Sequence, residues 1–413
     1  MKKFVLYPVL MSAFIFMLLF SSCEPEDVIE SPVENTTPSI YQPFDVLWST
    51  PITFRESTLT HPSCFTPVIR SQNFICGYYH FKDVPTVDPP ADTIVAFNIH
   101  TGKVAWKWTG FSTGSGRIWE SAAGDDFICV SNDEEVVCLN AADGTELTRR
   151  RSVLGIQNIS VSENIIFDID KISKSTCEIH YFDRKLNRWK TALILTDNGN
   201  NNIVLNTPMA DILPGGDTLL YFQKSLSQSS TFPDHTELYC YNMTTKTRIW
   251  QSFIHTFAPN LKNPPFMDEK YIYLLSLDAA HCFNKKTGAT VWTTSFHNAY
   301  LLNSYYLLKD DLLVIGYDAR GTIALWKKDG KIAYQLNNTG KYRMNYMVTY
   351  KNLLINDQPL IAVYDLYTGT RNMVLNTTVN AGWDNPCLAI EENTGLIYIL
   401  GYKDVRCIRV HGI

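Results

Sequence analysis

Charged residues are scarce in this sequence. Only 19% of the 413 residues are Asp, Glu, Lys or Arg, whereas 45% are apolar. A disordered chain has the opposite balance, so the composition excludes disorder and is sufficient for a large buried core. The formal net charge of −5 also excludes the broad positive field that attracts nucleic acid.

Familiar catalytic and metal-binding motifs are scarce as well. The sequence contains no His-Glu-x-x-His and no Cys-x-x-Cys, which removes the usual signatures of zinc hydrolases and thiol metal sites. One Gly-x-Ser-x-Gly occurs at residues 110–114, but this Gly-rich stretch follows a fourth-strand segment and opens no helix, whereas the nucleophile turn of a serine hydrolase does. Glu120 and Asp384 are two acids that could face each other across a central channel, as a glycosidase requires, but two acids alone are a weak pattern. We therefore expect a protein that is not an enzyme and that uses no metal and no cofactor.

Long hydrophobic runs are absent beyond residue 20, so the remainder contains no candidate membrane span. At the start, Lys2 and Lys3 precede an apolar run over residues 4–20, and two serines precede Cys23. This order is typical of an export signal, and a Cys after a small pair resembles the bacterial lipobox, where the thiol carries lipid. We predict a lipoprotein signal peptide over 1–22 and an acylated Cys23 with a flexible tether over 23–43. An uncleaved anchor or an ordinary signal peptide is the alternative.

One short pattern recurs along the rest of the chain. An apolar strand leads to a Thr-Gly or Asp-Gly turn, often with Trp four residues after the Gly, and the clearest copies span 94–106 and 280–292. The turns fall at positions 102, 144, 187, 246, 288, 330 and 369, with Asn187 and Lys246 replacing Gly. Their spacing of about 42 residues, with one longer interval between 187 and 246, is typical of four-stranded propeller blades.

The two ends of the chain complete the pattern. Residues 405–410 have the character of a third strand that lacks its fourth, and residues 44–50, which include Trp48, have the character of a fourth strand. Joining them forms an eighth blade and removes exposed sheet edges. We therefore predict an all-β, eight-bladed β-propeller of four-stranded antiparallel blades over 44–413, closed by pairing of the N-terminal strand with the C-terminal strands.

This repeat resembles that of pyrroloquinoline-quinone-like (PQQ-like) propellers, in which a small residue and Pro open the first strand. Thr66-Pro67-Val68, Thr207-Pro208-Met209, Pro264-Pro265-Phe266 and Asn385-Pro386-Cys387 match that opening. A lipid-anchored single-domain propeller is most similar to lipoproteins of the outer-membrane assembly factor B (BamB) type. Quinone-dependent dehydrogenases of this fold carry an adjacent Cys-Cys pair, which this sequence lacks.

The resemblance implies a Gram-negative outer-membrane lipoprotein, on the periplasmic or cell-surface side, that is anchored through Cys23. It would act as a non-catalytic, protein-binding scaffold in outer-membrane protein assembly, with an outer-membrane or surface protein as its partner and no nucleic acid. The alternative is a surface-exposed lipoprotein that binds a glycan or another ligand, which the acidic tether and aromatic loops favour. A quinone-dependent or glycan-cleaving enzyme is supported only by the fold.

Candidate binding residues gather where loops and channel mouths are expected. Second-to-third-strand loops at 78–92 and 225–236, together with the segments before first strands, give a candidate binding face: Tyr78, Tyr79, Phe81, Trp119, Glu120, Phe232, Tyr300, Trp383 and Asp384. First strands should line the channel, and most begin near an asparagine: Asn158, Asn206, Asn263, Asn303, Asn345 and Asn385. Such a ring could bind a ligand or could satisfy local turns, and we favour the turns.

The ten cysteines are expected to be structural apart from Cys23. Cys138, Cys240 and Cys282 each lie six residues before a turn position, and Cys407 matches them in strand register. Cys76 and Cys129 share a second-strand position. Equivalent positions in different blades are too far apart for a disulfide, so we expect buried free thiols. One pair among Cys64, Cys177 and Cys387 stays open.

Overall fold

The computed structural model describes most of the chain after residue 40. The described residues are 41–42, 44–51, 67–78, 92–112, 118–152, 155–197, 201–227, 235–254, 265–276, 278–296, 305–317, 321–337, 347–357, 361–375, 387–401 and 404–411. The predicted signal peptide, Cys23 and the predicted tether up to residue 40 lie outside them. Thr37–Ile413 forms one compact unit, separate from Met1–Thr36. No helix in these ranges has the length and apolar character to cross a membrane.

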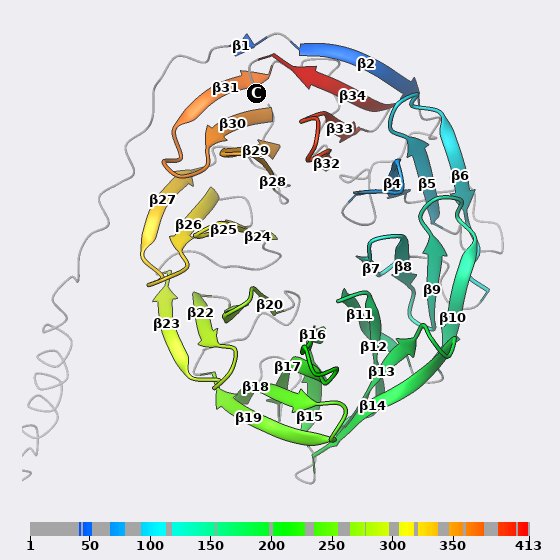
Figure 1. The fold of residues 1–413 in the computed structure, drawn as a ribbon, viewed down its shortest axis with the longest axis vertical. Coiled ribbons are helices and arrows are strands. Elements are labelled where there is room, and N and C mark those ends of the chain that lie inside the picture. Colours follow the sequence, from blue (N-terminus) through cyan, green and yellow to red (C-terminus); the bar gives the residue numbers. More distant parts are fainter. Residues whose placement is uncertain are drawn as a thin grey trace, which may run out of the picture. The chain divides into compact units, whose positions relative to one another are not determined.

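Eight sheets follow one another around a ring, and each is one blade (Figure 1). In every blade the fourth strand lies at the outside of the ring and the first strand at the inside. Blades I to IV comprise β3 (Val68–Arg70), β4 (Asn73–Tyr78), β5 (Thr93–Asn98) and β6 (Val104–Trp108); β7 (Glu120–Ala123), β8 (Phe127–Ser131), β9 (Glu135–Asn140) and β10 (Glu146–Arg151); β11 (Ile156–Ser162), β12 (Ile165–Ser173), β13 (Thr176–Asp183) and β14 (Arg188–Thr196); and β15 (Asn202–Leu205), β16 (Met209–Ile212), β17 (Thr218–Ser227), β18 (His235–Asn242) and β19 (Thr247–Phe253).

Blades V to VII continue the same antiparallel order. They comprise β20 (Phe266–Met267), β21 (Tyr271–Leu275), β22 (Ala279–Asn284) and β23 (Thr290–Ser295); β24 (Tyr305–Lys309), β25 (Leu312–Tyr317), β26 (Gly321–Trp326) and β27 (Ile332–Asn337); and β28 (Met347–Tyr350), β29 (Leu353–Asp357), β30 (Ile361–Asp365) and β31 (Arg371–Leu375). The predicted eight-bladed propeller is therefore confirmed.

Blade VIII joins the two ends of the chain. It is built from β32 (Cys387–Ile390), β33 (Ile397–Leu400), β34 (Asp404–Val410) and β2 (Phe44–Pro51). β2 pairs antiparallel with β34, which confirms the predicted closure. The junction with blade I is packed like a core, because the rings of Phe74 and Tyr398 stack at 5.7 Å.

A short strand precedes this closure. β1 (Tyr41–Gln42) lies within the segment predicted as a tether and pairs parallel with β31 at the outer edge of blade VII. The chain is thus attached to one blade before it enters the next.

Blade IV accounts for the one long interval between turns. Both β15 and β16 pair with β17, which is 10 residues long, so the innermost position of this blade is filled by two segments. β17 continues to Ser227 and β18 begins at His235. The predicted loop over 225–236 is therefore wrong in its bounds, because Ser225 and Thr236 already belong to paired strands, with their hydroxyl oxygens 3.1 Å apart.

The predicted turns all adopt the left-handed backbone conformation. The residues at the seven turn positions have φ between 47° and 74°, including Asn187 and Lys246. Glycine is needed at some of them for a second reason. A Cβ atom at Gly144 would lie 2.7 Å from the indole of Trp106 in blade I, and Trp106 donates a hydrogen bond to the carbonyl of Ala141 over 3.1 Å.

This contact recurs around the ring. The Trp of one blade packs on the turn Gly of the next at three further interfaces, in the pairs Trp48 and Gly102, Trp250 and Gly288, and Trp292 and Gly330. We call this contact the Trp–Gly dock. It explains why Gly and Trp recur together, although each Trp serves the following blade and not its own.

Candidate functional site between blades II and III

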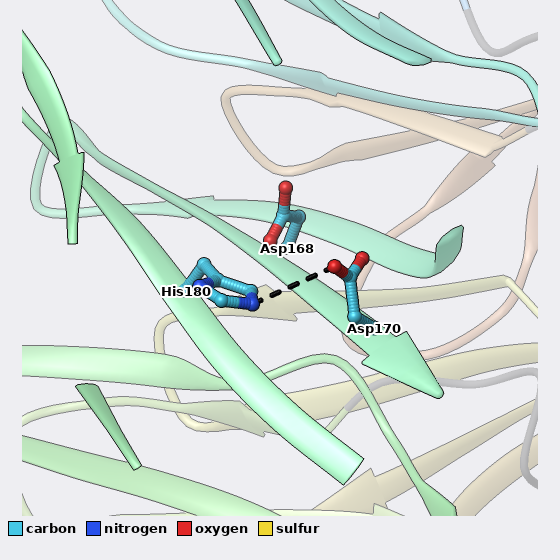
Figure 2. Close-up of side chains that lie close together, drawn as sticks. All are labelled: Asp168, Asp170 and His180. Atoms are coloured by element: carbon cyan, nitrogen blue, oxygen red, sulfur yellow. Dashed lines mark ion pairs between the residues drawn. The ribbon is translucent and has the colours of Figure 1, made fainter. Parts of the chain in front are cut away.

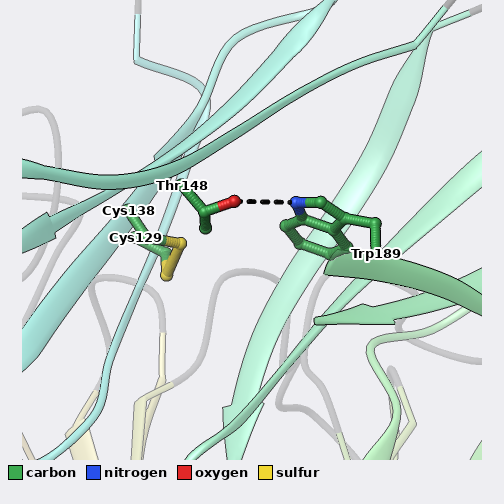
Figure 3. Close-up of a disulfide and its surroundings, with 4 residues drawn as sticks. All are labelled: Cys129, Cys138, Thr148 and Trp189. Carbon is green, nitrogen blue, oxygen red and sulfur yellow. Dashed lines mark hydrogen bonds between the residues drawn. A yellow bond between two sulfur atoms is a disulfide. The ribbon is translucent and has the colours of Figure 1, made fainter. Parts of the chain in front are cut away.

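The Trp–Gly dock is missing between blades II and III. Thr148 stands four residues after Gly144, where blades I, IV and V carry Trp, and Asn187 replaces the Gly of the next turn. The indole comes instead from blade III. Trp189 reaches back, and its Nε1 donates to Oγ1 of Thr148 over 3.1 Å (Figure 3). The direction of the Trp contact is therefore reversed at this interface.

Charged side chains also cross this interface, beside an apolar cluster that includes Phe127 of blade II and Phe182 of blade III. Asp168 and Asp170 are two residues apart on β12, so their side chains point to the same face of the strand. Arg150 of β10 lies against them, with Nη1 2.7 Å from Oδ2 of Asp168 and Nη2 2.5 Å from Oδ2 of Asp170. The same guanidinium lies 5.8 Å from the centre of the Trp189 ring. One arginine thus connects blade II to two buried carboxylates of blade III.

His180 completes this cluster from the adjacent strand. It stands opposite Asp168 in the pairing of β12 and β13, and its Nε2 points towards Asp170 at 3.5 Å (Figure 2). The same atom lies 3.2 Å from Oε2 of Glu178, yet it has hydrogen-bond geometry to neither carboxylate. Nδ1 lies 3.2 Å from Oγ1 of Thr191.

Burial dominates the electrostatics of the cluster. Burial is the main reason that the pKa of the Asp168 carboxyl is raised to about 7. The negative charge of Asp170 acts in the same direction, and Arg150 acts in the opposite direction. Burial and the positive charge of Arg150 lower the pKa of His180 to about 4. Burial alone would lower the pKa of Arg150, but its bonds to the two carboxylates raise it. Near neutral pH the imidazole is therefore uncharged and the guanidinium is charged.

The cluster has the donor atoms of a metal site. Asp168, Asp170 and His180 each offer one ligand atom, and these atoms lie within 4.8 Å of one another. No other set of three His, Cys, Asp or Glu side chains in the described part of the chain comes this close. Two carboxylates and one imidazole suit a divalent transition metal better than calcium or magnesium, which prefer oxygen ligands only.

Blade II also contains a disulfide, which joins its second and third strands. Cys129 of β8 and Cys138 of β9 are directly opposite in the strand pairing and are bonded (Figure 3). The expectation of free thiols is wrong for these two residues, because positions on neighbouring strands of one blade are within bonding distance even when equivalent positions in different blades are not. It is confirmed for the free, buried cysteines among the described residues: Cys76, Cys177, Cys240, Cys282 and Cys407.

Comparison with known proteins agrees with this architecture. Residues 234–371 match the family model described as outer membrane protein assembly factor BamB. The structure of BamB from Moraxella catarrhalis is similar, with a TM-score of 0.58 and 11% identity over 89% of this chain and 99% of that one. The chain is a BamB-like eight-bladed β-propeller.

Two other solved structures share the fold of this BamB-like propeller at similarly low identity. The computationally designed Ika8 protein has a TM-score of 0.59 and 12% identity over 84% of this chain and 96% of its own. A europium-containing methanol dehydrogenase has a TM-score of 0.58 and 10% identity over 86% and 84%. No curated protein sequence matches the chain. Because a designed protein and an enzyme share the fold, the fold alone does not identify a function.

The residues that match the family model cover one part of the ring. It begins at the third strand of blade IV and ends at the first residue of the last strand of blade VII. Two of the Trp–Gly docks lie within this range, whereas the interface between blades II and III lies outside it. The charged cluster therefore belongs to the part of the ring that the family model does not match.

Few of the sequence-predicted site residues fall in the described part of this BamB-like propeller. Trp119 and Glu120 are exposed at the start of β7, and Trp119 exposes 62% of its surface. Asn158 lies in β11 and donates to the carbonyl of Leu205 over 3.2 Å. Asn206 is buried and accepts from the backbone amide of Thr207. Tyr78 ends β4, and nothing is described of its side chain.

The remaining predicted residues lie outside the described ranges, and their roles stay predictions. They are Cys23, Tyr79, Phe81, Phe232, Tyr300, Trp383 and Asp384 with Asn263, Asn303, Asn345 and Asn385. Sequence reasoning missed Arg150, Asp168 and Asp170. The signal that could have found them is an alternation, since two acids interrupt an otherwise apolar run at 165–170. Three consecutive arginines at 149–151 end the preceding blade.

Proposed function

We propose that this protein is a non-catalytic scaffold that binds a partner protein in outer-membrane protein assembly, anchored by lipid on Cys23. The observation that carries the proposal is the match of residues 234–371 to the assembly factor BamB, together with the eight-bladed ring. A rigid ring that presents loops at its two faces suits binding.

The charged cluster supports a non-catalytic reading. Asp168 and Asp170 are buried and already bonded to Arg150, so their oxygens do not face a substrate. The buried Ser276 and His281 lie near the half-buried Asp278 in blade V, but Ser276 bridges the other two. A catalytic triad requires the histidine in the middle.

Trp119 indicates which face would meet the partner. Fourth-to-first and second-to-third connections emerge on one face of each antiparallel blade, and first-to-second and third-to-fourth turns emerge on the other. Trp119 precedes the first strand β7 and so belongs to the first face, whereas Leu186 lies in a third-to-fourth turn on the second. Both are exposed and apolar, which provides a matched pair of positions for mutation.

Crosslinking tests the proposal. The full-length, acylated, tagged protein is mildly crosslinked in membranes, solubilised and purified with whatever is attached. We expect a component of the outer-membrane barrel assembly machinery, with recovery lowered by Trp119→Ala and unchanged by Leu186→Ala. Recovery of surface transport or glycan-capture proteins instead would reject the assembly role and support the glycan- or ligand-binding alternative.

A further inference from the structure

The side chain of His180 is buried with one ring nitrogen unsatisfied. Only 8% of the residue is exposed, and Nε2 has no hydrogen-bond partner. That nitrogen points towards Asp170 (Figure 2), and it also lies 3.2 Å from Oε2 of Glu178. When Nδ1 carries the proton and donates to Thr191, the lone pair of Nε2 faces two carboxylates, and a cation held between them would stabilise this arrangement.

Negative charge exceeds positive charge at this position. Asp168, Asp170 and Glu178 contribute three carboxyl groups, and Arg150 is paired with the first two of them. One oxygen of Asp168, Oδ1, is also buried without a hydrogen-bond partner. Buried charge without compensation is costly, so the site has the capacity to accept a second cation.

The spacing of the donor atoms suits a metal ion. Two ligands on one tetrahedral ion with bonds of about 2.1 Å lie about 3.4 Å apart, and Nε2 of His180 lies 3.5 Å from Oδ2 of Asp170. We propose that Asp168, Asp170 and His180 form a binding site for a divalent transition metal such as zinc, and that Arg150 holds the two carboxylates together when no ion is bound.

The structure indicates from which side an ion would enter the site and which contact of Arg150 it would replace. Glu178 exposes 24% of its side chain beside the cluster, so we expect a cation to approach the buried ligands from its side. When the ion binds, the Arg150 guanidinium gives up its contact with Asp170 and keeps its position near the Trp189 ring. Mixed nitrogen and oxygen ligands select zinc, cobalt or manganese over calcium and magnesium.

Blade V offers a matched control within the same chain. His281 of β22 occupies the corresponding place in its blade, with Nδ1 3.2 Å from the hydroxyl of Thr293. Its Nε2 faces the hydroxyl of Ser276 at 3.3 Å in place of two carboxylates. His281→Gln should therefore perturb a buried histidine of the same kind without affecting metal binding.

The test is a titration of the purified, metal-free protein with Zn²⁺ and Co²⁺ by calorimetry and visible absorbance. We expect one equivalent to bind, with Co²⁺ absorbance typical of an imidazole and carboxylate site, and no binding of Ca²⁺. His180→Gln should weaken this binding by at least the roughly 10–100-fold that loss of a metal-supporting partner costs, and His281→Gln should leave it unchanged. Arg150→Gln should tighten it, because the ion no longer competes with the guanidinium.

Two results would overturn the proposal. One is a wild-type protein that binds no Zn²⁺ or Co²⁺ up to millimolar concentration. The other is one-equivalent binding that survives in His180→Gln, which would place the ion elsewhere, for example at the exposed pair of His411 and Asp45. Circular dichroism of each metal-free variant establishes that it is folded before titration.

Discussion

The interfaces on the two sides of blade II are closed by different chemistry. Towards blade I, the indole of Trp106 packs on Gly144, and the side chains of Trp106 and Asn73 donate hydrogen bonds to the carbonyl of Ala141. Towards blade III, a guanidinium holds two buried carboxylates, and a tryptophan approaches from the opposite blade. The comparison teaches that a repeat protein can keep its geometry where its repeat motif has been lost, provided that new contacts cross the same gap.

The two partners of the dock are lost together. Blade II lacks the Trp, and blade III, which would receive it, lacks the Gly and has Asn187 at the turn. Blade III in turn has Thr191 at its own Trp position, and blade IV has Lys246 at its turn. The Gly is therefore retained for the neighbouring indole as well as for the backbone, since Asn187 and Lys246 adopt the same left-handed conformation without it.

The largest expected effect on stability comes from removing the Trp of a Trp–Gly dock. Trp106→Ala removes a buried indole and leaves a cavity against Gly144, which should lower the free energy of unfolding by about 3–5 kcal/mol. Trp189→Ala should cost less, because Trp189 is only partly buried. Urea unfolding followed by far-ultraviolet circular dichroism measures both. An equal or larger loss for Trp189 would show that the reversed contact supports its interface as strongly as the Trp–Gly dock.

The charged interface should be nearly as sensitive, but only at its buried arginine. Arg150→Ala leaves Asp168 and Asp170 buried and unpaired, and removal of one partner of such a pair costs about 3–5 kcal/mol. Arg184 also crosses from blade III to blade II, where it pairs with Asp126 at 3.2 Å, but its side chain is 43% exposed. Arg184→Ala should cost less than about 1 kcal/mol.

Thermal unfolding in low and high salt separates these two arginines. Salt should weaken the contribution of Arg184 and leave that of Arg150 largely unchanged, since buried pairs are screened less. If Arg150→Ala has the small, salt-dependent effect expected of Arg184, then the carboxylates are not held as the structure indicates.

The disulfide should have a smaller effect. Cys129 and Cys138 are nine residues apart, and closing a loop of this size contributes about 2–3 kcal/mol through the unfolded state. The double variant Cys129→Ala/Cys138→Ala should lose that amount. Cys76→Ala, at the same second-strand position in blade I, removes a buried thiol without a cross-link and should lose less. An equal loss in both variants would mean that the bond adds nothing beyond packing.

Sequence reasoning recovered the ring but not this interface, for a physical reason. The turn and the Trp recur within one hairpin, so their spacing is local, and the strands of blade VIII match the same register from both ends of the chain. The contacts between blades join residues far apart in sequence, such as Arg150 with Asp168 and Asp170, and no period reveals them. Cys129 and Cys138 lie at equal distances from the centre of the turn between β8 and β9, so their pairing is local as well. The prediction of free thiols, in contrast, rests on equivalent positions in different blades.

The smallest of the main effects is the pH dependence that a buried histidine gives to stability. This histidine lies in a blade closed by the Trp–Gly dock. His281 of blade V is buried, and burial lowers its pKa to about 4. An unfolded histidine has a pKa of about 6.5, so below that pH the unfolded chain binds a proton that the folded protein does not. The contribution of His281 to stability is therefore constant above pH 6.5 and falls between pH 6.5 and 4, by about 2 kcal/mol at pH 5.

His281→Gln isolates this contribution. The variant should be less stable than the wild type at pH 7, because the contacts with Ser276 and Thr293 change, but its stability should decline less steeply between pH 6.5 and 4, since one proton fewer is taken up on unfolding. Urea midpoints across that range give the slope directly. Parallel curves for the two proteins would contradict the expected neutral histidine, because a group that titrates alike in both states contributes no pH dependence.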